Sequence, residues 1–451
     1  MMRKTKKRTK EEVLELIDKN GVQSIRLWFA DILGQLKGMS VTRSEIEGVL
    51  EEGQGFDGSS IEGFVRIEES DMMAIPDLDT FRIFPWKIGD EKGALMFCDI
   101  QNPDGTPFEG DPSYILKKTL DKIKKRGWTY YLGPELEYFY FKNNSYKNGS
   151  GPEILDEGSY FDYSTINEPV RMRKRTISAL EDLGIPVECS HHEVAQSQHE
   201  IDLQYQDALT MADYTMIYRL VVKEIALENN LYATFMPKPI FGINGSGMHT
   251  HQSLFEGDKN IFFEAKDQYH LSKTAKSFVA GLLNHVKEFT LVTNQWVNSY
   301  KRLVPGYEAP VYISWGRRNR SSLIRVPMYK LGKEKATRIE LRSPDPACNP
   351  YLAFSVMLAA GLKGIEKNYA LPEPVEEDIY DMTPKERAKN KIDTLPDSLE
   401  NAIKLFEKSE LMQETLGDHI FNRLIANKKK EWDEFRVHVS QYEIQKYLSI
   451  L

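Results

Sequence analysis

The start of the chain has the pattern of a helix followed by strands. Residues 9–20 carry apolar side chains at helical spacing, and Thr9 and Glu12 stand three apart, as in a capping box. Ile25, Leu27 and Phe29 alternate with Arg26 and Trp28, as in a half-buried strand. A second strand is expected to return after a turn. These elements predict a small mixed domain that ends in the turn-rich sequence before residue 106.

From residue 106 onward, helical and strand-like segments follow one another. Aromatic and apolar residues crowd 128–141, which predicts strands broken at Gly133 and Pro134. The Pro-rich, charged segment 371–396 is expected at the surface. Helical spacing predicts helices over 115–125, 204–229, 273–290, 350–362 and 397–435. The chain therefore divides into two domains of α+β composition, residues 1–105 and 106–451.

The composition narrows the class of protein. The chain has 451 residues, 41% of them hydrophobic and 28% charged, as in globular proteins, and its net charge of −8 argues against general nucleic-acid binding. Cys98, Cys189 and Cys348 are far apart, which argues against a disulfide framework or a zinc site and for a reducing compartment. No apolar run is long enough to span a membrane, and the basic start lacks the apolar core of a secretory signal. A cytoplasmic protein with no membrane partner is expected.

The first chemical motif is a pair of carboxylates, Glu135 and Glu137. On a strand, both side chains face the same side and Leu136 faces the other. Two adjacent like charges are unfavourable unless water or a cation neutralises them. The alternative is a strand face exposed to water, although the flanking aromatic and apolar residues make such exposure less favourable.

The second motif is dense in histidine and glutamate: His191-His192-Glu193 and His199-Glu200. The spacing is not that of a zinc protease, and a surface patch is the alternative to a metal role. Glu193 and Glu200 stand seven apart and would face opposite ways on one straight strand, so their joint use requires a bend.

The third motif, residues 245–251, reads GSGMHTH. Its glycines allow a backbone to approach a ligand closely, and His249 and His251 would share a strand face. The chain has no Walker A loop, and a glycine hairpin followed by core histidines is the alternative.

The fourth motif is basic. Arginine suits phosphate and carboxylate, and Glu340 would lie between Arg338 and Arg342 on one strand face. A salt-bridge ladder is the alternative. The crowded arginines are Arg302, Arg317, Arg318, Arg320, Arg325, Arg338 and Arg342. Together with the carboxylates and histidines they suggest Mg²⁺ or Mn²⁺ and phosphoryl transfer, as in an ATP-using transferase or ligase.

Six segments, in this order, resemble the class I glutamine synthetases of bacteria and archaea. They are FDGSSI at 56–61, GPELE at 133–137, NGSGMH at 244–249, NSYKRLVPGYEAP at 298–310, NRSS at 319–322 and RIELRSPDP at 338–346. The resemblance covers nearly the whole chain. It implies an α+β fold with a small N-terminal β-grasp-like domain and a larger C-terminal catalytic domain with a curved antiparallel sheet.

The resemblance also implies ATP-dependent ligation of ammonia to the γ-carboxylate of L-glutamate through a γ-glutamyl phosphate. Two or more Mg²⁺ ions per subunit are implied, with Mn²⁺ as a substitute. The residues that match the ligands of one metal are Glu137, Glu193 and Glu200, and those that match the ligands of the other are Glu135, His249 and Glu340. The positions that match the nucleotide site are Glu188, His251, Ser253, Arg325 and Arg338.

Positions around the acyl substrate match as well: Asn244, Gly245, Arg302 and Arg342. Arg320 matches the arginine that stabilises the transferring phosphoryl group. Asp57 matches the carboxylate that binds ammonium and accepts its proton, and Glu308 matches a flap residue that excludes water. In the family the position of Asp57 comes from the neighbouring subunit, which implies a homo-oligomer, by analogy a dodecamer of two hexameric rings. Binding of a nitrogen-regulatory protein stays open.

Two departures bear on regulation. Glu137 and Glu193 are 56 positions apart, closer than in members regulated by adenylylation, and the sequence after Tyr380 differs from theirs. The chain resembles the branch controlled by feedback inhibition without adenylylation. Arg66 is the hypothetical regulatory residue of that branch.

Two other functions remain open at this point. A ligase of the same superfamily that couples glutamate to a polyamine or another amine shares these motifs, although Asp57 and Ser60 favour ammonia. A catalytically silent relative with a nitrogen-sensing role is the second alternative. Every proposed metal ligand is present, which argues against it.

Overall fold

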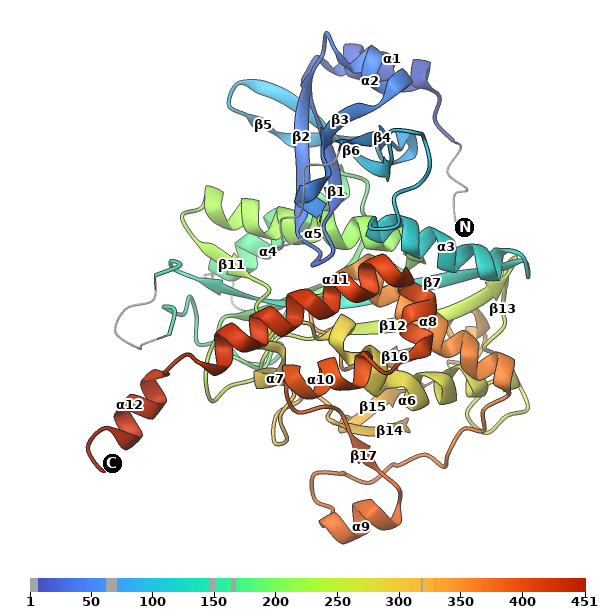
Figure 1. Ribbon diagram of the computed structural model, residues 1–451, viewed down its shortest axis with the longest axis vertical. Helices are drawn as coiled ribbons and strands as arrows, with labels where there is room; N and C mark the ends of the chain where they lie inside the picture. The colour runs from blue at the N-terminus through green and yellow to red at the C-terminus, as the bar shows by residue number, and fades with distance from the viewer. Residues whose placement is uncertain (1–6, 62–70, 146–150, 164–167, 318, 329) are drawn as a thin grey trace.

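The computed structural model describes residues 7–61, 71–145, 151–163, 168–317, 319–328 and 330–451. The N-terminal domain lies at one end of the molecule and the larger domain forms the rest (Figure 1). Arg66 lies outside the described residues. Within them, no helix has both the length and the apolar character needed to cross a membrane.

The N-terminal domain is a mixed sheet with short helices. Its elements are α1 (Lys10–Asn20), β1 (Val22–Ala30), β2 (Leu36–Thr42), α2 (Ile46–Glu52), β3 (Gln54–Asp57), η1 (Gly58–Ile61), β4 (Asp71–Pro76), η2 (Leu78–Thr80), β5 (Arg82–Ile88) and β6 (Glu91–Gln101). The strand order is β2-β1-β6-β4-β3, with β5 also paired to β6, and β1 and β6 run parallel. The predicted helix is confirmed: the capping box of Thr9 and Glu12 is formed, and Gly21 ends α1 at a φ of 64°.

The larger domain is built on a curled sheet, mostly antiparallel as expected, with one parallel pair, β14 and β15. The order is β17-β14-β15-β16-β12-β7-β9-β8, with the short strands β10 and β11 also paired to β7 and β13 paired to β12. Its strands are β7 (Trp128–Phe141), β8 (Val187–His192), β9 (Gln198–Leu203), β10 (Gln206–Asp207), β11 (Tyr232–Thr234), β12 (Met248–Glu256), β13 (Lys259–Asn260), β14 (Tyr312–Gly316), β15 (Ser322–Arg325), β16 (Ile339–Leu341) and β17 (Asp393–Thr394).

Helices pack against the sheet and form most of the core. They are α3 (Pro112–Lys124), α4 (Glu168–Asp182), α5 (Ala208–Glu228), α6 (Lys273–Thr293), α7 (Ser299–Arg302), η3 (Glu334–Ala336), α8 (Pro350–Lys367), α9 (Pro384–Lys389), α10 (Leu399–Phe406), α11 (Glu410–Arg436) and α12 (Gln441–Tyr447). Helices α6 and α8 approach so closely that a Cβ on Gly281 would lie 2.2 Å from the carbonyl oxygen of Ala360. Helices α6 and α8 are therefore tightly packed against each other, with no room for a larger side chain at Gly281.

The prediction that 128–141 breaks at Gly133 and Pro134 is wrong, because β7 runs through both residues. β7 pairs with β12 along one edge from residue 128 to 136. Along its other edge, β7 pairs with β10 at residues 131–132 and with β9 from Glu135 onward. Pro134 lies at the gap between these two partners, where a missing backbone N–H disrupts no ladder. The long helix predicted from 204 likewise begins only at Ala208, because residues 206–207 pair with β7 as β10.

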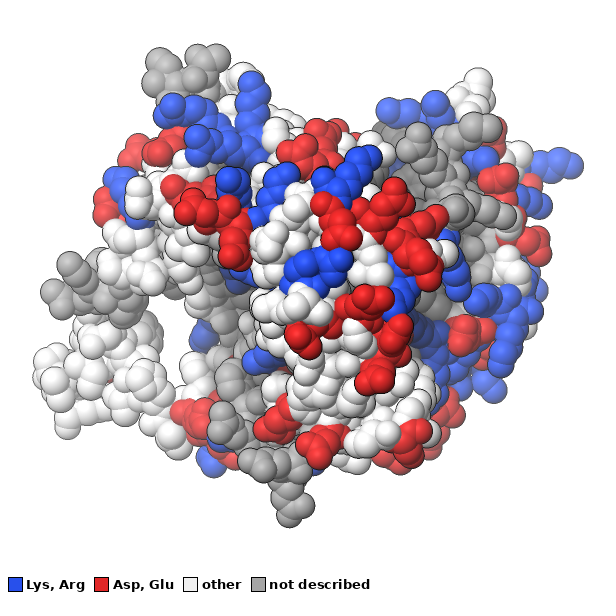
Figure 2. All heavy atoms as spheres, turned by 90° about the horizontal axis from the view of Figure 1, so that it is seen from above, with Lys and Arg blue, Asp and Glu red and all other residues white. Residues whose placement is uncertain are grey.

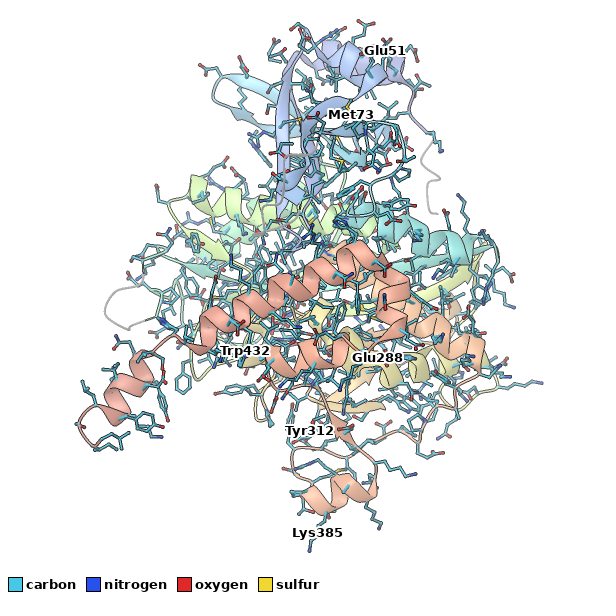
Figure 3. All side chains as sticks on the ribbon, viewed as in Figure 1. Glu51, Met73, Glu288, Tyr312, Lys385 and Trp432 are labelled. Carbon is cyan, nitrogen blue, oxygen red and sulfur yellow. The ribbon has the colours of Figure 1, made fainter. Side chains whose placement is uncertain are left out.

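The surface segment 371–396 is anchored more firmly than its composition suggests. Ile379 is fully buried. Tyr312 on β14 is labelled in Figure 3. The ring of Tyr380 lies 5.7 Å from the Tyr312 ring, centroid to centroid, and the guanidinium of Arg387 lies 5.1 Å from the same ring. This segment therefore packs onto the edge of the catalytic sheet and carries α9 outward.

The N-terminal domain is joined to the catalytic core at the loop after β1. Ile32 and Leu33 are buried in the large core, and Asn349 and Gln295 donate to the carbonyl oxygens of Asp31 and Leu33 at 2.9 and 2.8 Å. Gly34, with a φ of 74°, leaves no room for a Cβ, which would lie 2.6 Å from the Cα of Asn349. On the face seen in Figure 2, basic and acidic side chains are interspersed.

Candidate active site

Five neighbouring strands, β16, β12, β7, β9 and β8, carry the metal-binding candidate side chains on one face of the sheet. Glu135 on β7 pairs with His249 on β12 and with Asp202 on β9, and Glu137 pairs with Glu200. Directly paired residues of adjacent strands point to the same face, so these side chains form one continuous acidic surface.

The first cluster, called here the arginine-flanked group, consists of Glu135, His249 and Glu340. Nδ1 of His249 lies 3.6 Å from Oε2 of Glu135 and 3.6 Å from Oε1 of Glu340. These distances are too long for hydrogen bonds. The three ligand atoms are close enough together to hold one ion.

Cations surround the arginine-flanked group. Glu340 is buried and forms ion pairs with Arg325 and, at 3.3 Å, with Arg342. His251 lies 2.8 Å from Glu135 and accepts a hydrogen bond from Arg338 at 3.2 Å. Burial favours the protonated carboxyl, but the nearby histidines hold the pKa of Glu135 well below its usual value. The pKa of Glu340 is likewise lowered, by histidines and arginines.

The second cluster, called here the carboxylate group, consists of Glu137, Glu193, Glu200 and His191. β8 and β9 are antiparallel, and the chain reverses through residues 193–197, with a φ of 61° at Ser197. The bend needed to bring Glu193 and Glu200 to the same side is therefore present. His191, Glu193 and Glu200 can share one ion, and Glu137 lies opposite Glu200.

The carboxylate group is less well balanced than its neighbour: Arg302 lowers the pKa of Glu137, but burial and the nearby carboxylates outweigh it. Burial and Glu193 raise the pKa of Glu137 to about 8. Burial, with Asp202 and Glu135 beside it, raises the pKa of Glu200 well above its ordinary value. Buried carboxylates that repel one another this strongly favour a bound cation.

A buried network behind the bend was missed by the sequence reasoning. His192 and His199 lie 2.6 and 3.2 Å from the two carboxylate oxygens of Asp156, and Arg173 lies 2.7 Å from Nδ1 of His199. His192 also contacts the carbonyl oxygen of Glu193 at 2.6 Å. The network holds the bend in place. Asp156 and Arg173 come from distant segments, and no sequence pattern connected them with the histidines.

The residues expected around the nucleotide gather at one cavity of about 220 Å³. Glu188, His251, Ser253 and Arg338 line it, together with Asp202. Arg325 is not in this lining and instead contacts Glu340. The cavity borders the arginine-flanked group through Glu135.

The glycine segment contacts the carboxylate group at Glu137. Gly247 donates its N–H to Glu137 at 2.9 Å, and a Cβ at this position would lie 2.5 Å from Nη2 of Arg302. Gln198 joins the carboxylate of Glu137 to the carbonyl of Gly245, at 2.7 and 3.1 Å. Asn244 directly precedes this segment. Glycine is therefore required here for close approach of backbone, carboxylate and guanidinium.

Two of the expected arginines are buried and hold backbone carbonyls. Arg302 donates to the carbonyl oxygens of Ser343 and Arg342 at 2.7 and 3.2 Å, and Arg342 donates to that of Arg320. Arg320 itself is exposed, with its guanidinium 5.9 Å from the ring centroid of Tyr160.

Glu308 and Asp57 lie at the edges of this arrangement. Glu308 is exposed, and its charge helps to raise the pKa of Glu137. Asp57 is also exposed and ends β3 in the N-terminal sheet, not on the catalytic sheet (Figure 1). Its carboxylate accepts hydrogen bonds from the backbone N–H and the hydroxyl of Ser59, both at 2.9 Å.

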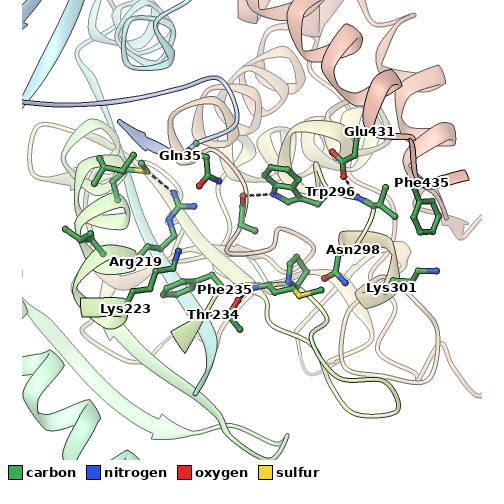
Figure 4. A pocket seen from close by; sticks show the side chains of 18 residues that line it. Gln35, Arg219, Lys223, Thr234, Phe235, Trp296, Asn298, Lys301, Glu431 and Phe435 are labelled. Atoms are coloured by element: carbon green, nitrogen blue, oxygen red, sulfur yellow. Dashed lines mark hydrogen bonds between the residues drawn. The ribbon is translucent and has the colours of Figure 1, made fainter. Parts of the chain in front are cut away.

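A larger cavity than the one at the nucleotide position lies elsewhere. It measures about 720 Å³ and lies between α5, the end of α11 and the loop after β1 (Figure 4). Arg219, Trp296 and Glu431 line it, but their polar groups are engaged with backbone and neighbouring side chains. It lacks the facing carboxylates of the sheet, so its size alone does not mark it as the active site.

Comparison with known proteins bears directly on this arrangement. The family model described as "Glutamine synthetase, catalytic domain" matches residues 109–447, and "Glutamine synthetase, beta-Grasp domain" matches residues 21–103. The chain belongs to the glutamine synthetase family. The curated glutamine synthetase of Mycobacterium tuberculosis (strain ATCC 25618 / H37Rv) is 50% identical over 98% of this chain and 100% of its own length.

Other family members agree. The glutamine synthetase of Thermotoga maritima is 49% identical over 98% of this chain and 99% of its own length. The solved structure of Plasmodium falciparum glutamine synthetase superposes with a TM-score of 0.88 at 27% identity, covering 99% of this chain and 100% of that one. The β-grasp and catalytic domains expected from the sequence, and the bacterial type of the enzyme, are thereby confirmed.

The donor sets fit the divalent metal that is typical of glutamine synthetases. Both clusters offer carboxylate oxygens with a single imidazole, which suits a hard cation such as Mg²⁺ or Mn²⁺. The raised pKa values of Glu137 and Glu200 show that the carboxylate group is short of positive charge. A divalent cation would supply it.

Proposed function

We propose that the chain, a glutamate–ammonia ligase by its family, works through a γ-glutamyl phosphate on the acidic face of the catalytic sheet. The observation that carries this proposal is the adjacency of the carboxylate group and the arginine-flanked group on paired strands. A carboxylate is a poor electrophile, and phosphorylation converts it into one that ammonia can attack. The runner-up activity, amine ligation, is tested in the same experiment below.

We assign two Mg²⁺ positions to these clusters. Glu135, His249 and Glu340 would hold one ion, and Glu137, Glu193 and Glu200 the other, with His191 beside them. When bound, Mg²⁺ neutralises phosphate oxygens and orients them. ATP would enter the cavity lined by Glu188, His251, Ser253 and Arg338, which opens beside the arginine-flanked group. Arg325, held by Glu340, would support the phosphates.

The remaining residues act on the acyl and amine substrates. Asn244, Gly245, Arg302 and Arg342 would hold glutamate beside the carboxylate group. Arg302 supports this role because it lies against Gly247 and its guanidinium is fixed by backbone carbonyls.

Three exposed residues would complete the chemistry. Arg320 would stabilise the transferring phosphoryl group. Asp57 would accept a proton from ammonium, which frees the nitrogen lone pair for attack. Glu308 would close over the acyl phosphate and exclude water. The support for Glu308 is its electrostatic effect on Glu137.

We further propose a shared active site in a homo-oligomer, a dodecamer of two hexameric rings. The support is that Asp57 is exposed on the N-terminal domain, whereas its proposed partners line the catalytic sheet. We place the domain boundary near residue 105, after β6 and before α3. A cytoplasmic location and binding of a nitrogen-regulatory protein are proposed on family grounds alone.

We propose control by feedback inhibition and no adenylylation. The support is that the Tyr380 hydroxyl already donates to the carbonyl oxygens of Tyr307 and Ala309, both at 3.0 Å. Those residues flank Glu308. Arg66→Ala should relieve inhibition by glutamine, and unchanged inhibition would remove Arg66 from the regulatory site.

The deciding experiment measures phosphate release from ATP with Mg²⁺, omitting glutamate or ammonium in turn. Release should require both substrates and should be lost or strongly slowed in Asp57→Ala. Release with glutamate and putrescine but without a response to ammonium would favour the amine ligase. No release from an assembled oligomer would favour a silent relative.

Site sharing has its own test. Asp57→Ala and Arg320→Ala subunits, mixed and reassembled, would regenerate intact sites only if the two residues meet across subunits. Random mixing then restores about a quarter of the sites. An inactive mixture, in oligomers shown by native mass spectrometry to be hybrid, would place both residues in one subunit's site.

A further inference from the structure

A third set of metal-binding side chains lies next to the two clusters already described. Cys189 and His191 stand two apart on β8 and so share a face of the sheet. Cys189 pairs with Asp202 on β9, and its Sγ lies 2.7 Å from Oδ2 of Asp202. One ligand atom from each of the three residues lies within 4.8 Å of the others.

The hydrogen bonding of His191 leaves one of its ring nitrogens without a partner. Its Nε2 lies 2.7 Å from a carboxylate oxygen of Glu193, which can only accept, so Nε2 carries the proton of the neutral ring. Nδ1 then keeps its lone pair. This atom is buried and has no hydrogen-bond partner within the described residues.

Asp202 shows the same feature. Its Oδ2 accepts the thiol of Cys189, while its Oδ1 is buried and has no hydrogen-bond partner in the described part of the chain. Buried polar atoms are nearly always paired in folded proteins, and two unpaired acceptors in one cluster require an explanation. A cation held between the two residues would give both atoms a partner.

We infer that Cys189, His191 and Asp202 form a third cation site, selective for a thiophilic divalent ion such as Zn²⁺ over Mg²⁺. A sulfur, an imidazole nitrogen and a carboxylate oxygen make three protein ligands of the kind zinc accepts, with water in the fourth position. Binding replaces the thiol proton, which passes to solvent, and no electron is transferred.

The geometry requires only small shifts. Zinc bonds of about 2.0 to 2.3 Å place two ligand atoms of a tetrahedral site roughly 3.3 to 3.8 Å apart. The ligand atoms found here are already within 4.8 Å of one another, and Cys189 is exposed enough to turn. The separation of the three cysteines in sequence had argued against zinc. The spacing of the cysteines concerns sulfur ligands alone, whereas this set takes one ligand atom each from Cys189, His191 and Asp202 on two paired strands.

The site goes beyond the proposed ligation and is tested by metal binding. The complete oligomer is stripped of metal, saturated with Mg²⁺ to fill the two carboxylate-rich positions, and dialysed against Zn²⁺. One Zn²⁺ per subunit should resist the excess Mg²⁺. Cys189→Ser should weaken this binding by at least about tenfold, the scale of losing a metal-site contact. Ser190→Ala, on the opposite face of the same strand, is the matched control.

Two signatures identify the ligand. Cys98 and Cys348 are buried, so thiol labelling of the folded enzyme reports on Cys189, and Zn²⁺ should slow it. Co²⁺ in place of Zn²⁺ should give a thiolate charge-transfer band that Cys189→Ser lacks. Equal Zn²⁺ retention in Cys189→Ser, displacement by Mg²⁺, or no retention would overturn the proposal. Ammonium-dependent phosphate release, measured with Mg²⁺ alone on the same preparations, reports separately on the proposed function.

Discussion

The two clusters on the catalytic sheet contain similar side chains but differ in how their charge is balanced. In the arginine-flanked group, Glu340 contacts Arg325 and Arg342, and its pKa is lowered. In the carboxylate group, the pKa of Glu137 is raised to about 8 by burial and by Glu193. The protein thus balances the charge of the arginine-flanked group largely with its own side chains, whereas the carboxylate group has too little positive charge nearby to offset its carboxylates. In the proposed mechanism, the arginine-flanked group, which would hold the phosphates, has its charge balanced in advance, and the carboxylate group depends more on metal.

The largest expected effect comes from removing a carboxylate of the carboxylate group. Glu200→Gln should lower kcat/KM by more than about 100-fold, because even residues that only orient metal ligands contribute about 10- to 100-fold. Steady-state phosphate release measures this loss. Glu228→Gln, an exposed substitution at the end of α5, should leave activity unchanged. A fall of less than about tenfold for Glu200→Gln would contradict the assignment.

The comparison also predicts opposite effects on stability in the absence of metal. Glu340→Gln leaves two arginines without their buried partner and should cost about 3 to 5 kcal/mol. Burial and neighbouring carboxylates raise the pKa of Glu200 and favour its neutral form, so the neutral Glu200→Gln should leave the metal-free enzyme as stable as, or more stable than, wild type. Denaturant unfolding with a chelator present distinguishes the two. Equal destabilisation by both substitutions would show that the two clusters do not differ in how their charge is balanced.

The third prediction concerns pH and metal. Between about 4.5, the usual value for Glu137, and its raised pKa of about 8, the folded metal-free enzyme binds a proton that the unfolded chain lacks. Its free energy of unfolding therefore falls as the pH rises through this range. Mg²⁺ must displace that proton, so it should stabilise the enzyme more at high pH. Glu135 and Glu340, with lowered pKa values, contribute stability that is lost only as the pH falls below about 4.5.

Thermal scans with Mg²⁺ and with chelator measure this difference. The Mg²⁺-induced rise in apparent Tm should be larger near pH 8 than near pH 6 by about 2 °C or more. Glu137→Gln should flatten the dependence, since the titrating group is gone. The same rise at both pH values in the wild-type enzyme would argue against a protonated carboxylate group.

The smallest effect concerns the loop around Glu308. Tyr380→Phe removes two hydrogen bonds to that loop, and about 1 kcal/mol of lost restraint corresponds to roughly fivefold more ATP hydrolysis without ammonium. The KM for ATP should stay the same, because the loop acts on the carboxylate group. A change in KM for ATP with no added hydrolysis would assign Tyr380 to the nucleotide side instead.

Much of the site could be predicted from the sequence because the direction of a side chain within a helix or strand repeats at a fixed spacing. Glu135 and Glu137 share a face because strand side chains alternate, and the capping box at Thr9 follows from contacts three residues apart. The motif segments led to the family, which the comparisons confirm. Arg66 stays untested because it lies outside the described residues.

Tertiary structure alone decided which distant residues meet and what charge they carry. Strand β7 continues through Pro134 because its partners change there, a fact of sheet pairing that no local signal contains. Asp156 reaches His192 and His199 from a separate loop, and Cys189 reaches Asp202 across a strand pair. The pKa difference between the two clusters likewise depends on burial and on neighbours from other strands. Sequence determines side-chain type and local periodicity, whereas long-range pairing sets distance and solvation, on which electrostatics depends.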